Sequence, residues 1–196
     1  MAAHLMESPP NTSLPWPVSQ PALLAHYWEA RPCEVRDAAV TLQLALQALR
    51  DAGFSTFFTK GRSRRSTGEP LIPSEQVLSA ALAKGMNRRD IDASPITELG
   101  LSLGLWSGGP EPEAFEINVL IGSTSPHAKN CFLLHLPTSG PYALQREFDR
   151  LKALFHRLAV VLHSDQGIVC APNEVAWEGR LLAAAIPSLA RWKSQG

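Results

Sequence analysis

A two-residue alternation in the middle of the chain constrains the fold more than any other feature. Four leucines alternate with glycine and serine between Leu99 and Leu105, and the stretch 115–121 repeats the pattern with Phe, Ile, Val and Ile. Because successive side chains of a β-strand point to opposite faces, this period predicts two strands with one face buried. The apolar run Cys131–Leu136, closed by Pro137, predicts a third. Sequential strands joined by polar loops favour an antiparallel meander.

Apolar residues at helical spacing predict two helices before these strands. From Glu34 to Ala52 apolar side chains recur at steps of three and four, which forms one stripe along a helix, and Gly53 supplies a left-handed stop. A second helix is expected after Ser74, whose hydroxyl suits the N-cap, and Gly85 ends it.

The longest apolar stripe, from Leu144 to Leu162, predicts a third helix after the strands. Ser139 is its expected cap, and Pro141 fits the first turn, where a missing N–H costs nothing. Helices that are separate from a strand meander predict an α+β fold, with an antiparallel sheet and the helices packed on one face.

Shorter segments complete the expected order. Phe54–Thr59 and Ile168–Ala171 are β-branched or aromatic enough for strands, and 180–186 has the composition of a short helix. Leu23–Trp28 is apolar and aromatic, and its period fits a strand or a helical turn equally well.

Composition indicates one compact domain with a leading segment. Of 196 residues, 45% are hydrophobic, which is enough for a core. Prolines at positions 9, 10, 15, 17 and 21 predict a loosely ordered, Pro-rich lead-in over 1–21, followed by a single domain over 22–196. We find neither a secretory signal nor a membrane-spanning run, and three widely spaced cysteines favour reduced thiols in a cytoplasmic protein.

The charge is balanced over the whole chain but uneven along it. Eighteen Lys and Arg against eighteen Asp and Glu argue against a nucleic-acid binder, which normally carries a basic excess. A basic run lies at 60–65, whereas the stretch 91–128 has no Lys or Arg and holds five acids: Asp92, Glu98, Glu111, Glu113 and Glu116. This stretch is either a solvated acidic edge or a docking surface for a basic partner. Trp106 within it is either a residue at the edge of the core or an anchor of an interface.

No residue pattern predicts an enzyme. Asp149, His156 and His163 share a helix face, but seven-residue steps separate them by about 10.5 Å each, too far to bind one metal ion. The glycines near 100–109 form no phosphate-binding motif, and 122–125 is no nucleophile elbow. Glu111 and Glu113 leave open a small metal-dependent hydrolase. We expect no catalytic site, cofactor or metal.

Several motif positions together resemble a known family. Tyr27, Trp28 and Arg31 precede the first helix, Glu98–Gly108 contains Gly100 and Trp106, and Asn130 and Pro137 bracket the third strand. In this combination, over about residues 23–172, the chain resembles the immunity protein 52 family, small α+β proteins encoded beside polymorphic bacterial toxins.

The resemblance implies a non-enzymatic cytoplasmic protein that binds and neutralises a cognate toxin. In this family the toxin is often nuclease-type and is delivered in interbacterial competition by a secretion system such as type VI. The resemblance provides no interface residues, and it implies structural roles for the motif positions. From the residues alone, Trp106 and the five acids of 91–128 are the expected toxin-binding set. An adaptor or chaperone for a secreted effector is the other binding function left open.

Overall fold

The computed structural model describes residues 21–59, 70–126, 128–144 and 146–170. The lead-in expected over 1–21 (apart from Pro21), the basic run at 60–65 and the short helix expected over 180–186 lie outside these residues. Among the described helices, none has the length and apolar character needed to cross a membrane.

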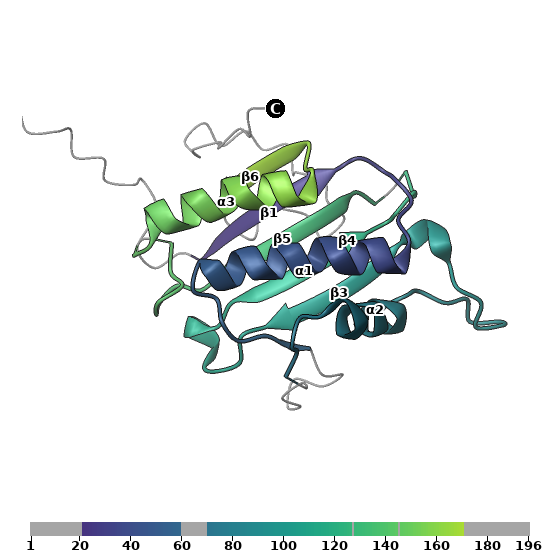
Figure 1. Ribbon diagram of the computed structural model, residues 1–196, viewed down its shortest axis with the longest axis horizontal. Coiled ribbons are helices and arrows are strands. Elements are labelled where there is room, and N and C mark those ends of the chain that lie inside the picture. The colour runs from purple at the N-terminus through teal and green to yellow at the C-terminus, as the bar shows by residue number, and fades with distance from the viewer. Residues whose placement is uncertain (1–20, 60–69, 127, 145, 171–196) are drawn as a thin grey trace, which may run out of the picture.

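Six strands form one sheet in the order β2-β3-β4-β5-β1-β6, and every neighbouring pair is antiparallel (Figure 1). The strands are β1 (Ala22–Trp28), β2 (Phe58–Thr59), β3 (Leu101–Trp106), β4 (Glu116–Ile121), β5 (Asn130–Leu136) and β6 (Gln166–Cys170). The expected meander of three strands is β3-β4-β5, and β2 pairs with the outer side of β3. The first strand of the chain then enters the sheet beside β5, and the last strand pairs with it from the other side.

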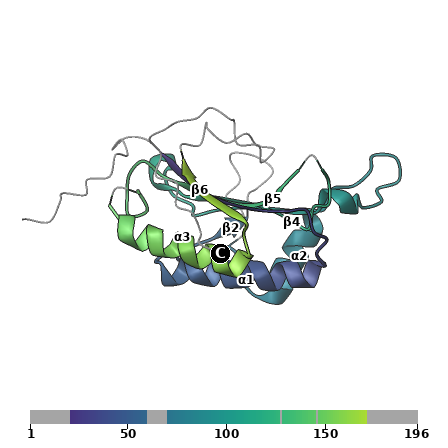
Figure 2. The same ribbon diagram turned by 90° about the horizontal axis from the view of Figure 1, so that it is seen from above.

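Three helices lie side by side on one face of this sheet, which confirms the α+β prediction (Figure 2). They are α1 (Val35–Asp51), α2 (Glu75–Lys84) and α3 (Phe148–Leu162). The helix α1 lies between the other two; α2 packs over β3, and α3 packs over β1 and β6. Short 3-10 turns precede β3 (η1, Thr97–Leu99) and β4 (η2, Glu111–Glu113).

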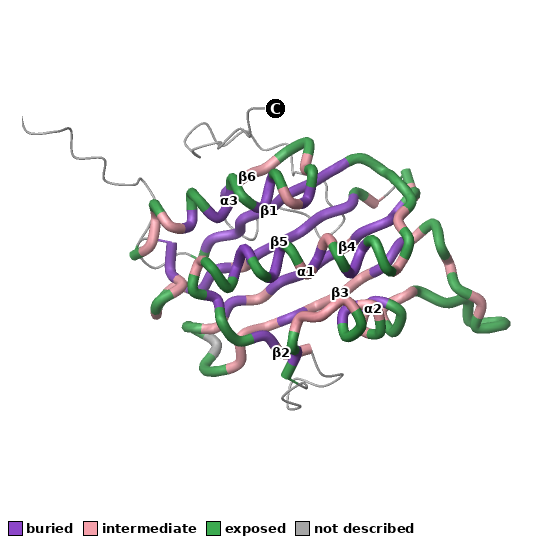
Figure 3. The backbone as a smooth tube through the Cα atoms, in the orientation of Figure 1, coloured by how far each residue is buried: buried purple, intermediate pink, exposed green. Residues whose placement is uncertain are grey.

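The strand register explains why the helix-covered face is the core. Pairing aligns one apolar side chain from each of five strands in a row beneath the helices, and each is at most 5% exposed: Leu105, Ile117, Leu134, Leu24 and Val169. The apolar stripes of α1 and α3 bury against such rows. Figure 3 shows the result as buried central strands beneath helices that alternate between buried and exposed turns.

The ends of α1 and α2 follow the sequence signals. Gly53 adopts a left-handed φ of +87° after α1, and the Ser74 hydroxyl accepts a hydrogen bond from Val77 N at 3.3 Å. Gly85 ends α2 for a different reason, close approach to β3: a Cβ there would lie 1.9 Å from the Ser102 carbonyl oxygen. The Ser102 hydroxyl donates to the Gly85 carbonyl at 2.8 Å, and Met86 forms a β-bridge with Leu101.

The expected start of the third helix at Ser139 and Pro141 is wrong. The helix begins at Phe148, and Ser139 instead donates from both its N–H and its hydroxyl to the Pro112 carbonyl, at 3.1 and 2.9 Å. This contact holds the preceding segment against η2. Tyr142 stacks on Phe54 there, with ring centroids 4.8 Å apart, so core packing replaces the extra helical turn.

Two further expectations are refined. Leu23–Trp28 is a strand, because it fills the position between β5 and β6. Of the strand expected over 54–59, only β2 at its end pairs with β3, while Phe54 and Phe57 turn into the core. Leu99 ends η1, so three of the four alternating leucines belong to β3.

A histidine is buried in the core between β1 and α3. The ring of His26 is 0% exposed and lies 4.5 Å from the Phe155 ring; its Nδ1 is 3.2 Å from the Ser164 hydroxyl. Burial lowers the pKa of His26 to about 3, and the nearby His156 lowers it further in the same direction. The folded protein therefore holds this side chain neutral.

We predict that His26 makes folding sensitive to mild acid. Unfolded His26 takes up a proton near pH 6.5 and the folded form only near pH 3, so its stabilising contribution is complete above pH 6.5 and is lost as the pH falls through this interval. Each pH unit below about 6 should cost on the order of 1 kcal/mol. Urea unfolding at pH 6 and pH 5 should show a steeper loss for the wild type than for His26→Gln. Equal slopes would contradict the prediction.

Candidate functional site

The opposite face of the sheet carries no helix among the described elements (Figure 2). We call it the helix-free face; three cross-strand rows define it. One row holds Trp106, Glu116, His135, Leu23 and Cys170, the next Gly104, Asn118, Leu133, Ala25 and Ile168, and the third Ser102, Leu120, Cys131, Tyr27 and Gln166. The face is apolar and buried along β1 and becomes polar towards β3 and β4.

A cavity of about 430 Å³ opens on the helix-free face over β3, β4 and β5. On the helix-free face β3 contributes the small residues Ser102 and Gly104, which leave room beside the longer side chains of β4 and β5; Leu103 of β3 also lines the cavity. Leu120 and Leu133 line its apolar part, and Asn118 lines its polar part. The small residues between the leucines were visible in the sequence, but a hollow could not be inferred until the register aligned them with long side chains on β4 and β5.

Two of the expected toxin-binding residues meet at one end of this face. Trp106 on β3 and Glu116 on β4 are direct cross-strand partners. Trp106 is half-buried and lies 6.3 Å from the Phe58 ring, measured between ring centroids. Glu116 Oε1 accepts a hydrogen bond from Asn118 Nδ2 at 2.7 Å, which orients the carboxylate along β4. An aromatic surface and a fixed carboxylate are thus side by side.

Glu111 and Glu113 belong to η2, in the β3–β4 connection at the same end of the sheet. The turn is held by a hydrogen bond from Glu113 N to the Pro110 carbonyl and by the two bonds from Ser139 to Pro112. Glu113 is exposed and its side chain packs beside Gly140. The connection between β3 and β4 therefore presents Glu113 from a fixed backbone. We call this end of the sheet, made of η2, Trp106 and Glu116, the acidic end.

The remaining two expected residues lie at the other end of β3. Glu98 is in η1, and Asp92 lies in the loop before it. Asp92 shares that loop with Arg88 and Arg89, which lie just before the acidic stretch 91–128 begins. The structure therefore divides the six expected residues between two ends of the sheet. The segment 106–116 of the acidic end contains no Lys or Arg, whereas the loop that holds Asp92 contains two arginines.

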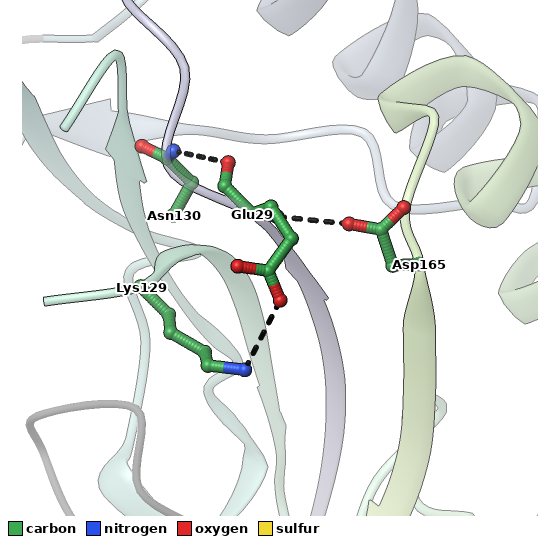
Figure 4. A network of polar contacts seen from close by, with 4 residues as sticks. All are labelled: Glu29, Lys129, Asn130 and Asp165. Carbon is green, nitrogen blue, oxygen red and sulfur yellow. Dashed lines mark hydrogen bonds and ion pairs between the residues drawn. The ribbon is translucent and has the colours of Figure 1, made fainter. Parts of the chain in front are cut away.

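The motif positions of the family resemblance have structural surroundings, and Asn130 is the clearest case (Figure 4). Its buried amide donates to the Glu29 and Ser123 carbonyls at 3.0 and 3.1 Å, and its Oδ1 accepts from Ser123 N at 2.7 Å. The Glu29 carboxylate also forms an ion pair with Lys129 Nζ at 3.5 Å, and the Glu29 N–H donates to the Asp165 carboxylate at 2.8 Å. Asn130 thereby fastens the end of β1 to the β4–β5 turn.

The other motif residues near β1 and β5 also support the fold. Trp28 is 3% exposed and lies in the core. Arg31 donates to the Leu162 carbonyl at 3.1 Å, and its positive charge stabilises the C-terminal end of α3. Tyr27 is buried on the helix-free face, and burial raises the pKa of its hydroxyl. Pro137 is buried directly after β5, where its missing N–H ends the ladder.

Two motif glycines are needed for backbone reasons. Gly100 has a φ of +70°, and a Cβ there would lie 2.5 Å from Ser123 N. Gly108 has a φ of +72°, and a Cβ there would lie 2.9 Å from the Phe58 ring. Both positions therefore favour glycine, because the backbone is left-handed and a Cβ would have too little room.

Within the described residues, no group of three His, Cys, Asp or Glu side chains is placed to hold a metal ion. The described cysteines Cys33, Cys131 and Cys170 form no disulfide, and burial raises the pKa of Cys131 to about 11. A thiol with so high a pKa is a weak nucleophile at neutral pH.

Comparison with known proteins identifies no family: neither a family model nor a curated protein matches the chain. Among solved structures, the type VI secretion system (T6SS) protein PA0821 of Pseudomonas aeruginosa aligns with a TM-score of 0.45 and 14% identity. The alignment covers 78% of this chain and 43% of that protein, so this chain spans less than half of its length. So distant a match carries no inference about function, and the resemblance to the immunity protein 52 family stays a prediction.

We predict that Asn130→Ala destabilises the protein by about 2–3 kcal/mol, because it leaves the two buried backbone groups of Ser123 and the Glu29 carbonyl without their partner. Urea unfolding at pH 7 measures this. The control is Asn87→Ala, an exposed asparagine that should change stability by no more than about 0.5 kcal/mol. Equal effects of the two substitutions would show that the Asn130 network contributes little.

Proposed function

We propose that this protein is an immunity protein that binds a cognate bacterial toxin and blocks its action. The observation that carries the proposal is the acidic end, where the half-buried Trp106 lies beside the oriented Glu116 carboxylate and the fixed η2 turn. Aromatic residues anchor interfaces, and carboxylates around them select a basic partner. A nuclease-type toxin presents such a basic surface, because it must bind the phosphates of its substrate.

Neutralisation sets a demand on affinity. A toxin active at a few copies per cell requires a Kd near ~1 nM, equivalent to about −12 kcal/mol. An interface of roughly 1,200–2,000 Å² supplies this when it contains a few well-buried anchors. The acidic end and the neighbouring cavity provide a contiguous region in which such an interface can form.

Co-expression with the toxin encoded beside this protein tests the proposal directly. We expect cells to survive the toxin with this protein and to die without it. A complex that forms while the cells still die would favour an adaptor or chaperone for the secreted effector. Absence of a complex together with cell death would overturn both functions.

Charge reversal should identify the acidic end as the docking region. We predict that changing Glu111, Glu113 and Glu116 together to Lys weakens toxin binding and slows association, with the largest effect at low salt. The matched control changes Asp37, Glu75 and Asp149 to Lys, which alters the net charge equally but on the helix layer. Binding kinetics measured at two salt concentrations should separate the variants; similar on-rates would remove the acidic end from the interface.

A further inference from the structure

A loop before β3 projects beyond the end of the sheet as a narrow hairpin (Figure 1). We call it the finger; it comprises residues 87–96, between α2 and η1. Backbone hydrogen bonds close it at both levels: Ile96 N to the Asn87 carbonyl at 2.8 Å, and Arg89 N to the Ser94 carbonyl at 2.9 Å. A β-bridge pairs Arg88 with Pro95 between them. The finger therefore has a defined backbone.

Side chains fix the tip as well. Arg88 Nη1 donates to the Ala93 carbonyl at 3.0 Å, and Asp92 Oδ1 accepts from both the N–H and the hydroxyl of Ser94, at 3.0 and 2.7 Å. These two bonds from Ser94 lower the pKa of Asp92, which keeps it charged. Ala93 has a φ of +54°, a left-handed conformation that residues with a Cβ rarely adopt. Departures of this kind concentrate at functional sites.

This fixed tip presents an apolar side chain to solvent. Ile91 is 97% exposed, more than any other large apolar residue of the described chain; Ile72 and Val160 follow at 74% and 72%. Asp90 and Asp92 flank it, and both are exposed. Isolated exposed apolar residues are common on protein surfaces. Ile91 stands at the end of a projecting, internally bonded loop. Ile91 makes no contribution to the core that would explain its presence there.

We propose that the finger anchors the toxin, with Ile91 inserted into an apolar pocket whose rim is basic. This rests on the proposed function and adds a second contact region at the opposite end of β3 from the acidic end. A branched side chain on a fixed backbone loses little conformational freedom when it is buried, so its transfer from water gives a large net gain. Arg88 and Arg89 lie in the paired part of the finger below the tip, so Asp90 and Asp92 are the charges next to Ile91 and select Lys or Arg around the pocket.

The test compares matched truncations in the full-length protein. Toxin binding is measured for Ile91→Ala and for the controls Ile72→Ala and Val160→Ala, which remove exposed apolar side chains elsewhere. We expect Ile91→Ala to raise Kd at least about tenfold, chiefly through faster dissociation, and both controls to bind like the wild type. Asp90→Asn should instead slow association at low salt.

Two outcomes decide between the proposals. If the wild type binds the toxin and Ile91→Ala binds equally well, the finger is not an anchor and the proposed function stands. If the wild type does not bind, the proposed function fails and the inference about the finger fails with it. Because Ile91 is almost fully exposed, Ile91→Ala should unfold in urea as the wild type does, so a loss of binding reports on the interface.

Discussion

The antiparallel register between β1 and its two neighbours is the constraint on which the rest of the structure depends. It aligns Leu24 with Leu134 and Val169, which gives α3 an apolar surface to cover, and sends Leu23 and Tyr27 to the other side. A slip of one residue would exchange the two faces, because side chains alternate along a strand. Asn130 lies opposite Trp28 at the end of this pairing, so its buried hydrogen bonds fix the register where the ladder stops.

The same register places the core side chains on one face of the sheet and the proposed contact residues on the other. Side chains of the helix-covered face are nearly all apolar and closely packed, so substitutions there act on folding. On the helix-free face, Ser102, Gly104 and Asn118 help to line a cavity, and the expected contact residues Trp106 and Glu116 pair one row further along the same face. Under the proposed function, strands of one sheet serve two purposes, and the proposed contact residues can vary while the core stays the same.

Much of the fold could be predicted from the sequence, because period and caps are local signals. The strands around 101–106 and 116–121 and the helix α1 followed from spacing alone. The start of α3 did not, since Ser139 bonds to the distant Pro112, and a tertiary contact of this kind leaves no local pattern. Of the site, the acids and Trp106 were visible as residue types, but their division between two ends of the sheet depends on the hairpin geometry. The finger has no apolar period, so Ile91 could not be distinguished from a buried residue.

The close contact between Gly85 and Ser102 has a consequence for the behaviour of the protein in solution. An unpaired strand at the border of a sheet is a template for association with other chains. The outer border of β3 is protected at both ends, by the short β2 beside Leu105 and Trp106 and by the Met86 bridge to Leu101. A side chain larger than glycine at position 85 would push α2 away, which exposes this border and uncovers the buried Leu78 and Leu82, so self-association would accompany the loss of packing.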